Sequence, residues 1–165
     1  MDIWELVARE RIRDSLARYN WSGDALRLDE LALAFCADGV LEIRDGERAE
    51  GRDAIVAFLG GVGGPEAPSA GDDAARRAAR QAAAESAGVT RIVRHNLTNT
   101  RFVELTPTAA KVSSYFTVVT EIGLDHYGRY RDTFVPVGDE WLIQHRFVST
   151  DWRSAQSTMA APGSV

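Results

Sequence analysis

The stretch from residue 111 to residue 151, KVSSYFTVVTEIGLDHYGRYRDTFVPVGDEWLIQHRFVSTD, alternates apolar and polar residues over most of its length. Turn-forming residues interrupt it at 123–125 and 137–139. Together with the similar segment that precedes it, this pattern predicts four long strands, at 90–105, 111–121, 127–135 and 140–151. Because the connections are short, neighbouring strands should pair antiparallel. The second half of the chain is therefore predicted to be an antiparallel meander.

The first third of the chain has helical spacing instead. Between Ile3 and Tyr19 the apolar residues recur every three or four positions, and Asp2 is placed to cap the start of a helix. We expect this helix to end at the break 21–24. The elements expected after it are a helix at 28–37 ended by Asp38 and Gly39, a strand at 40–44, a hairpin turn at 45–46 and a helix at 54–59.

Residues 62–89 differ from the rest in composition. Glycines and prolines open the segment, and 72–87 is rich in Ala, Arg and Gln, which favour a helix but bury little apolar surface. We expect 62–89 to be an inserted helical flap that is weakly docked, either a lid over a pocket or an exposed excursion without function. The small, polar tail at 154–165 is expected to be flexible.

Helices gathered in the first part of the chain and strands in the second indicate an α+β fold. We expect a single domain at 1–153. In it a curved antiparallel sheet wraps around the N-terminal helices as a cone-shaped α+β barrel and leaves an apolar pocket.

The composition excludes several functional classes. The 165 residues are 45% hydrophobic and 26% charged, with a net charge of −5, which suits one ordinary globular domain. An acidic chain without a basic block is a poor nucleic-acid binder. The single cysteine, Cys36, excludes an intrachain disulfide and a cysteine-rich zinc module. No signal peptide or membrane span is apparent, so we expect a cytoplasmic protein with neither a nucleic-acid nor a membrane partner.

No strong catalytic motif is present. The glycine-rich stretch at 60–64 lacks the continuation of a phosphate-binding loop, and the three histidines are too dispersed for a metal signature. What remains is a set of single polar residues inside apolar elements, namely Tyr19, Asp24, His95 and Arg146. Each also has a structural interpretation. The tyrosine could belong to the core, the aspartate could cap the second helix, the histidine could be a structural strand residue, and the arginine could be a surface cation.

Several short strings stand in a particular order along the chain. They are Tyr19-x-x-x-x-Asp24, Phe35-Cys36-Ala37-Asp38, Gly51-Arg52-Asp53-Ala54-Ile55, His95-Asn96-Leu97-Thr98-Asn99, Gly128-Arg129-Tyr130-Arg131-Asp132, and Gly138-Asp139-Glu140-Trp141-Leu142-Ile143 with Arg146. In order and spacing they resemble the SnoaL-like branch of the nuclear transport factor 2-like superfamily. Within that branch the pattern is most similar to bile-acid 7α-dehydratase, scytalone dehydratase and hexachlorocyclohexane dehydrochlorinase.

This resemblance implies a role for each of the four polar residues. Asp24 and His95 would form a dyad in which the carboxylate fixes the imidazole tautomer and stabilises the imidazolium. Tyr19 would donate a hydrogen bond or a proton, and Arg146 would stabilise developing negative charge. These groups suit the elimination of water or another small group without a metal or organic cofactor. The resemblance therefore implies a dehydratase-type lyase of secondary metabolism that acts on a hydrophobic ring-containing metabolite.

Strand alternation predicts what surrounds this site. If Arg146 faces inward, the same face carries Leu142, Gln144 and Val148, and the opposite face carries Trp141, Ile143, His145 and Phe147. The expected substrate-binding residues are Leu41, Ile43, Asn99, Phe116, Val118 and Tyr130. An outward apolar stripe would need cover, so we expect a homo-oligomer, either a dimer or a trimer.

Two other functions stay open at this point. One is a SnoaL-like cyclase or isomerase of polyketide or terpenoid biosynthesis, which would use the same dyad for deprotonation without elimination. The other is a non-catalytic module that binds a small ligand, because one fold can host all three functions.

Overall fold

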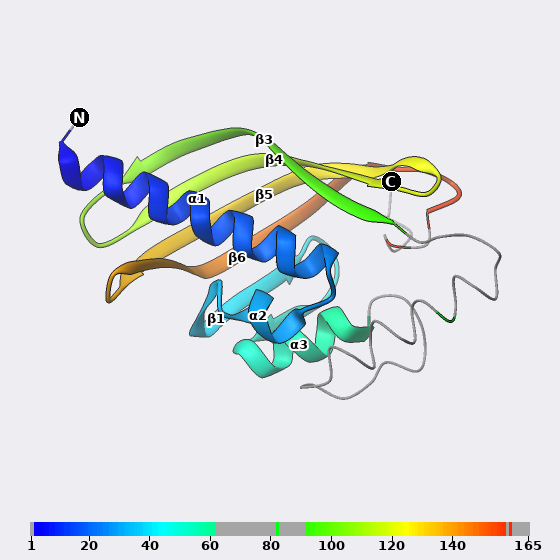
Figure 1. Ribbon diagram of the computed structural model, residues 1–165, viewed down its shortest axis with the longest axis horizontal. Helices are drawn as coiled ribbons and strands as arrows, with labels where there is room; N and C mark the ends of the chain where they lie inside the picture. The colour runs from blue at the N-terminus through cyan, green and yellow to red at the C-terminus, as the bar shows by residue number, and fades with distance from the viewer. Residues whose placement is uncertain (1, 62–81, 83–91, 158, 160–165) are drawn as a thin grey trace.

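The computed structural model describes residues 2–61, 82, 92–157 and 159, and a curved, open sheet with a long helix across one face dominates it (Figure 1). Its elements are α1 (Ile3–Asp24), α2 (Leu28–Ala32), β1 (Phe35–Ile43), β2 (Arg48–Glu50), α3 (Arg52–Gly61), β3 (Val93–Leu105), β4 (Ala110–Thr120), β5 (Gly123–Val137) and β6 (Glu140–Arg153). The predicted flap at 62–89 lies outside the described residues except for residue 82, as does most of the predicted tail.

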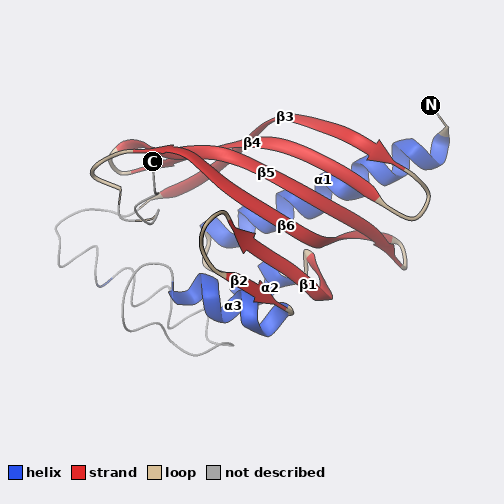
Figure 2. Cartoon of the chain, turned by 180° about the vertical axis from the view of Figure 1, so that it is seen from behind, coloured by secondary structure: helices blue, strands red, loops and turns tan. Residues whose placement is uncertain are grey.

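The six strands have the order β2-β1-β6-β5-β4-β3, so β2 and β3 are the two edges of the sheet. The meander β3 to β6 pairs antiparallel throughout, whereas β1 pairs parallel with β6. Seen from behind, the other face of the meander carries no helix among the described residues (Figure 2). The α+β class and the curved sheet with N-terminal helices are confirmed, with the sheet open rather than closed.

The first helix begins as predicted and ends later than predicted. Asp2 and Glu5 form a reciprocal capping box at its start. The helix then continues to Asp24, through the stretch 21–24 where the sequence predicts a break. None of the described helices has the length and apolar character that a membrane span requires.

The predicted helix at 28–37 is wrong in its second half. α2 ends at Ala32, and Phe35 and Cys36 already belong to β1. The reason is tertiary: β1 lies beside β6, with Phe35 opposite Ile143, and Ile143 donates a backbone hydrogen bond to Ala34. Phe35 and Cys36 are both buried, as their apolar character predicts, but they lie in a strand rather than in a helix.

The last strand contains a register shift that changes the predicted alternation. Thr133 pairs with His145, but the next residue of β5, Phe134, pairs with Ile143, so one residue of β6 is extra. Arg146 therefore shares the inner face with Trp141 and Ile143, which are buried in the core cluster. The predictions that those two side chains point outward, and that Leu142 and Gln144 point inward, are wrong for this reason.

The core lies between α1 and the concave face of the sheet. Ile12 and Leu16 of α1 are buried against strand residues such as Phe116 and Phe134. Gly128 of β5 lies opposite Phe116 of β4. A Cβ atom there would lie 2.0 Å from the backbone oxygen of Ser149 and 2.9 Å from the ring of Phe116. The absence of a side chain at Gly128 therefore lets the Phe116 ring and the backbone of β6 pack directly against the backbone of β5.

We expect Gly128→Ala to lower the free energy of unfolding in urea by at least about 2 kcal/mol, because backbone must move to admit the methyl group. Gly46→Ala is the control, since the nearest atoms there lie at 3.4 Å, and it should change the free energy by less than about 0.5 kcal/mol. Equal stabilities for the two variants would contradict this account of the packing.

Candidate functional site

Asp24 and His95 meet where the end of α1 reaches the edge strand β3. The imidazole Nδ1 of His95 lies 2.6 Å from Asp24 Oδ1, and the backbone N–H of His95 donates to Asp24 Oδ2 at 3.0 Å. The predicted contact between these two residues is confirmed. The alternative of a helix cap does not apply, because Asp24 is the last residue of α1 and the N-cap of α2 is Arg27.

The geometry assigns the proton on the His95 ring. An ionised carboxylate can only accept, so Nδ1 carries the hydrogen that bonds Asp24. In the neutral form of the ring, the second nitrogen, Nε2, then has a free lone pair. The two side chains keep 20% and 12% of their surface exposed, so the dyad is accessible rather than sealed in the core.

Arg146 is fully buried, and the rings of two tyrosines cover its guanidinium. Its guanidinium donates to both carboxylate oxygens of Asp132, from Nε and Nη2, each at 2.8 Å. Its central carbon lies 4.1 Å from the ring centre of Tyr19 and 4.2 Å from that of Tyr130. The predicted inward direction of Arg146 and Tyr130 is confirmed. His145 points away, as predicted, and lies 2.9 Å from Glu42 through Nε2.

Burial and charge determine the protonation of this cluster. Burial raises the pKa of Tyr19 and, more strongly, that of Tyr130, and the nearby Arg146 opposes this only in part. Burial alone would lower the pKa of Arg146, but Asp132 outweighs it and raises the pKa. At neutral pH both phenols are therefore protonated and the arginine is charged, with that charge already balanced by Asp132.

Aromatic rings form a continuous wall across the concave face. Tyr19 meets Tyr130 edge-on at 6.1 Å, Tyr130 stacks on Phe116 at 4.6 Å, and Phe116 meets His126 edge-on at 5.8 Å. His126 is absent from the sequence-based site. The one feature of the sequence that could have pointed to His126 is the acidic residue before it, Asp125, with which its ring forms a hydrogen bond.

The predicted substrate-binding residues divide into three groups. Leu41, Phe116, Val118 and Tyr130 are buried together in the core cluster, and Ile43 is partly buried against it. Asn99 is exposed and has a left-handed φ of 51°, at a register shift between β3 and β4. The structure does not bring Asn99 together with the others, because this bulge turns the residue out to solvent.

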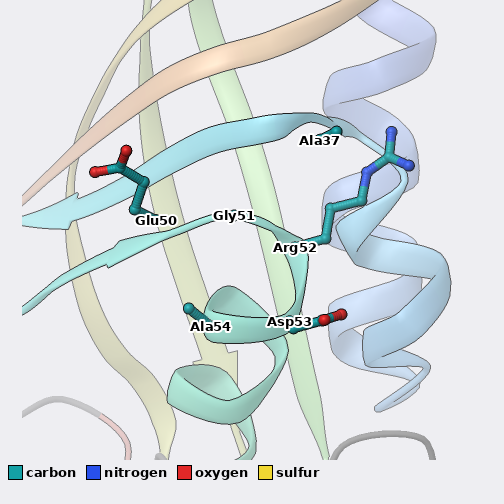
Figure 3. Close-up of a pocket in the computed structure, with 6 residues that line it drawn as sticks. All are labelled: Ala37, Glu50, Gly51, Arg52, Asp53 and Ala54. Carbon is teal, nitrogen blue, oxygen red and sulfur yellow. The ribbon is translucent and has the colours of Figure 1, made fainter.

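One surface hollow, of about 370 Å³, has neither member of the dyad in its lining (Figure 3). Its lining comes from β1, β2 and the start of α3, namely Ala37, Glu50, Gly51, Arg52, Asp53 and Ala54. Arg52 is engaged in structure there, since it donates to the Phe35 carbonyl at 3.0 and 2.7 Å. Across the described residues, no group of His, Cys, Asp or Glu has the arrangement of a metal site.

Comparison with known proteins matches residues 4–147 to a family model described as a SnoaL-like domain. No curated protein matches the sequence. The matches among solved structures are distant in sequence and similar in fold.

A proposed scytalone dehydratase of Novosphingobium aromaticivorans is 22% identical, with a TM-score of 0.69 over 95% of this chain and 93% of that one. Rv3472, a Mycobacterium tuberculosis protein of unknown function, is also 22% identical, with a TM-score of 0.66 over 95% of this chain and 79% of that one. ActVI-ORFA of Streptomyces coelicolor is 17% identical, with a TM-score of 0.63 over 87% of this chain and 97% of that one.

The buried ion pair gives a stability prediction. Arg146→Met should lower the free energy of unfolding by about 3–5 kcal/mol, because it leaves the Asp132 carboxylate buried without a partner. The double variant Arg146→Met/Asp132→Leu should recover much of that loss in urea unfolding.

Arg18→Met serves as the control, because Arg18 of α1 pairs with Glu140 at 2.7 Å and both side chains are partly exposed, so that solvent screens the pair. Its loss should be much smaller. A double variant as unstable as the single one would contradict this view of the pair.

Proposed function

The chain belongs to the family of SnoaL-like domains, and on that premise we propose that it is a cofactor-independent lyase. Its reaction would be a dehydratase-type elimination from a hydrophobic ring-containing metabolite. The observation that carries the proposal is the Asp24–His95 pair, because it leaves one imidazole nitrogen free at a partly exposed position.

In this reaction His95 Nε2 takes a proton from a carbon next to a carbonyl group of the substrate. The imidazolium so formed is stabilised by Asp24, and such a positioned base contributes about 10²–10⁴ in rate. The C–H electrons form the new double bond as the C–O bond breaks. The proton on His95 passes to the departing hydroxyl, so that water leaves and the imidazole returns to its neutral form.

Tyr19 donates a hydrogen bond to the substrate carbonyl while negative charge develops on it. The raised pKa of Tyr19 supports this role, since the phenol remains protonated at neutral pH. Arg146 holds the rings of Tyr19 and Tyr130 in place. It does not touch the substrate in this proposal, because its charge is enclosed and paired with Asp132.

The second candidate is an isomerase or cyclase that uses the same dyad for deprotonation alone. The burial of Arg146 favours it, because this guanidinium is then not available to assist a leaving group. The third candidate, a binding module without catalysis, would need the dyad only as a polar anchor for the ligand.

Incubation with a panel of alicyclic and aromatic β-hydroxy ketones, followed by mass spectrometry, distinguishes these functions. We expect loss of one water from at least one compound, whereas a product isobaric with its substrate would indicate an isomerase. Asp24→Asn and His95→Gln should each lower kcat/KM by about 10²–10⁴, and the double variant should lose no more than the worse single variant.

His145→Gln is the matched control for this experiment, because His145 pairs with Glu42 on the outer side and should leave turnover unchanged. Full activity in His95→Gln would refute the dyad as the base.

We further propose that the chain forms a homo-oligomer through the outer face of the meander. This face carries exposed aromatic residues, with Tyr115 opposite Arg129 and Tyr127 stacked on Trp152 at 5.5 Å. Tyr115 and Trp152 keep 51% and 43% of their surface exposed. A cluster of large exposed apolar side chains on one face is typical of an association surface.

Trp152→Glu should therefore shift the mass measured by light scattering after size exclusion from the oligomer to the monomer. Leu6→Glu on α1 introduces the same charge at an equally exposed apolar position away from this face, and it should leave the mass unchanged. A monomeric parent protein would contradict the proposal directly.

A further inference from the structure

We propose that His126 is a second imidazole of the same site, positioned by Asp125 to accept a hydrogen bond from a hydroxyl group on a ring-containing ligand. The inference rests on the proposed function only in its choice of site, since it concerns ligand recognition rather than turnover.

The strand register places the two imidazoles on one face. His95 of β3 lies opposite Val118 of β4, and Val118 lies opposite His126 of β5. Residues directly opposite each other project to the same side of a sheet. Two strand spacings separate the two histidines, so their backbones are about 10 Å apart. This span is comparable to that of a fused two- or three-ring molecule.

A bulge brings Asp125 to the same side as its neighbour. Val118 pairs with His126 and Val119 pairs with Leu124, so Asp125 is the extra residue in β5. In a regular strand, adjacent side chains point to opposite faces. Here the bulge lets the carboxylate of Asp125 reach the ring of His126, with Nδ1 and Oδ1 2.6 Å apart.

The carboxylate of Asp125 is itself held firmly. Ser157 Oγ donates to Oδ1 at 2.6 Å, Thr120 Oγ1 donates to Oδ2 at 3.3 Å, and the residue is only 1% exposed. Three donors from three parts of the chain therefore converge on one buried carboxylate. Since Asp125 can only accept, the Nδ1 of His126 carries the proton and Nε2 is left as an acceptor.

Burial is the main reason why the ring stays neutral. It lowers the pKa of His126, and the adjacent Asp125 opposes this only in part. Burial would raise the pKa of Asp125, but the hydrogen bonds from Ser157, His126 and Thr120 outweigh it and lower the pKa. Arg153 is the β6 residue opposite His126 and adds a positive charge on that side. Near neutral pH the pair is therefore a carboxylate and a neutral imidazole.

The surroundings define the ligand class. The ring of His126 borders the Phe116 ring, which stacks on Tyr130, and the side chain keeps 11% of its surface exposed. A neutral acceptor at the end of an aromatic wall recognises an apolar ring that carries a hydroxyl donor. An ether in place of that hydroxyl cannot make the bond.

Nitrogen-15 spectra of the three imidazoles in the full chain test this assignment. Near neutral pH we expect His126 in the Nδ1-protonated neutral form, with the signal identified by its loss in His126→Asn. Asp125→Asn should abolish that preference at His126 and leave His95 unaffected. Asp24→Asn is the matched control, and it should change His95 alone. A charged His126, or one protonated at Nε2, would overturn the proposal.

Titration with 2-naphthol and with 2-methoxynaphthalene tests the recognition. We expect 2-naphthol to shift the Nε2 resonance of His126 and to bind at least fivefold more weakly to His126→Asn. The methyl ether should bind the parent and the variant equally. Equal binding of 2-naphthol to both, or no binding at all, would overturn the proposal. A protein that passes this test yet turns over no substrate would refute the lyase function without touching the inference.

Discussion

The ion pair between Arg146 and Asp132 is the constraint on which the rest of the site depends. Neither side chain keeps any accessible surface, so the desolvation of two charges must be offset inside the molecule. Two charge-assisted hydrogen bonds do so in part, and the faces of Tyr19 and Tyr130 cover the guanidinium on either side. Because Tyr19 belongs to α1 and the other three residues belong to β5 and β6, the pair also fixes the helix on the sheet. That fixed helix carries Asp24 to the edge strand.

Irregularities in the strands then decide which side chains reach the concave face. The register shift in β6 returns Arg146 to the inner side after Ile143, and the bulge at Asp125 joins that residue to His126. In a regular strand Arg146 and Ile143 would face opposite sides of the sheet, and so would Asp125 and His126. Bulges beside a functional site commonly re-aim side chains in this way. The polar groups of this site therefore sit within an otherwise apolar face without breaking the sheet.

The sequence predicted the elements better than it predicted their ends. The meander, the first helix and the contact between Asp24 and His95 all follow from periodicity or from the resemblance, and all are confirmed. The error at 28–37 arises because β1 gains its strand partner, β6, from the far end of the chain. His126 was missed for a similar reason. Two of the three donors to the carboxylate of its partner, Asp125, come from other segments of the chain.

By itself, the sequence determined the class of fold, the order of its elements and the residue types available for acid–base chemistry. These follow from local periodicity, turn residues and composition, which act over a few neighbouring positions. Only the tertiary structure decided that Arg146 is paired with Asp132, that Asn99 faces solvent and that a second imidazole shares the face of His95. Each of these depends on the register between strands. A shift of one residue reverses the face of every side chain that follows, and only the partner strand sets that register.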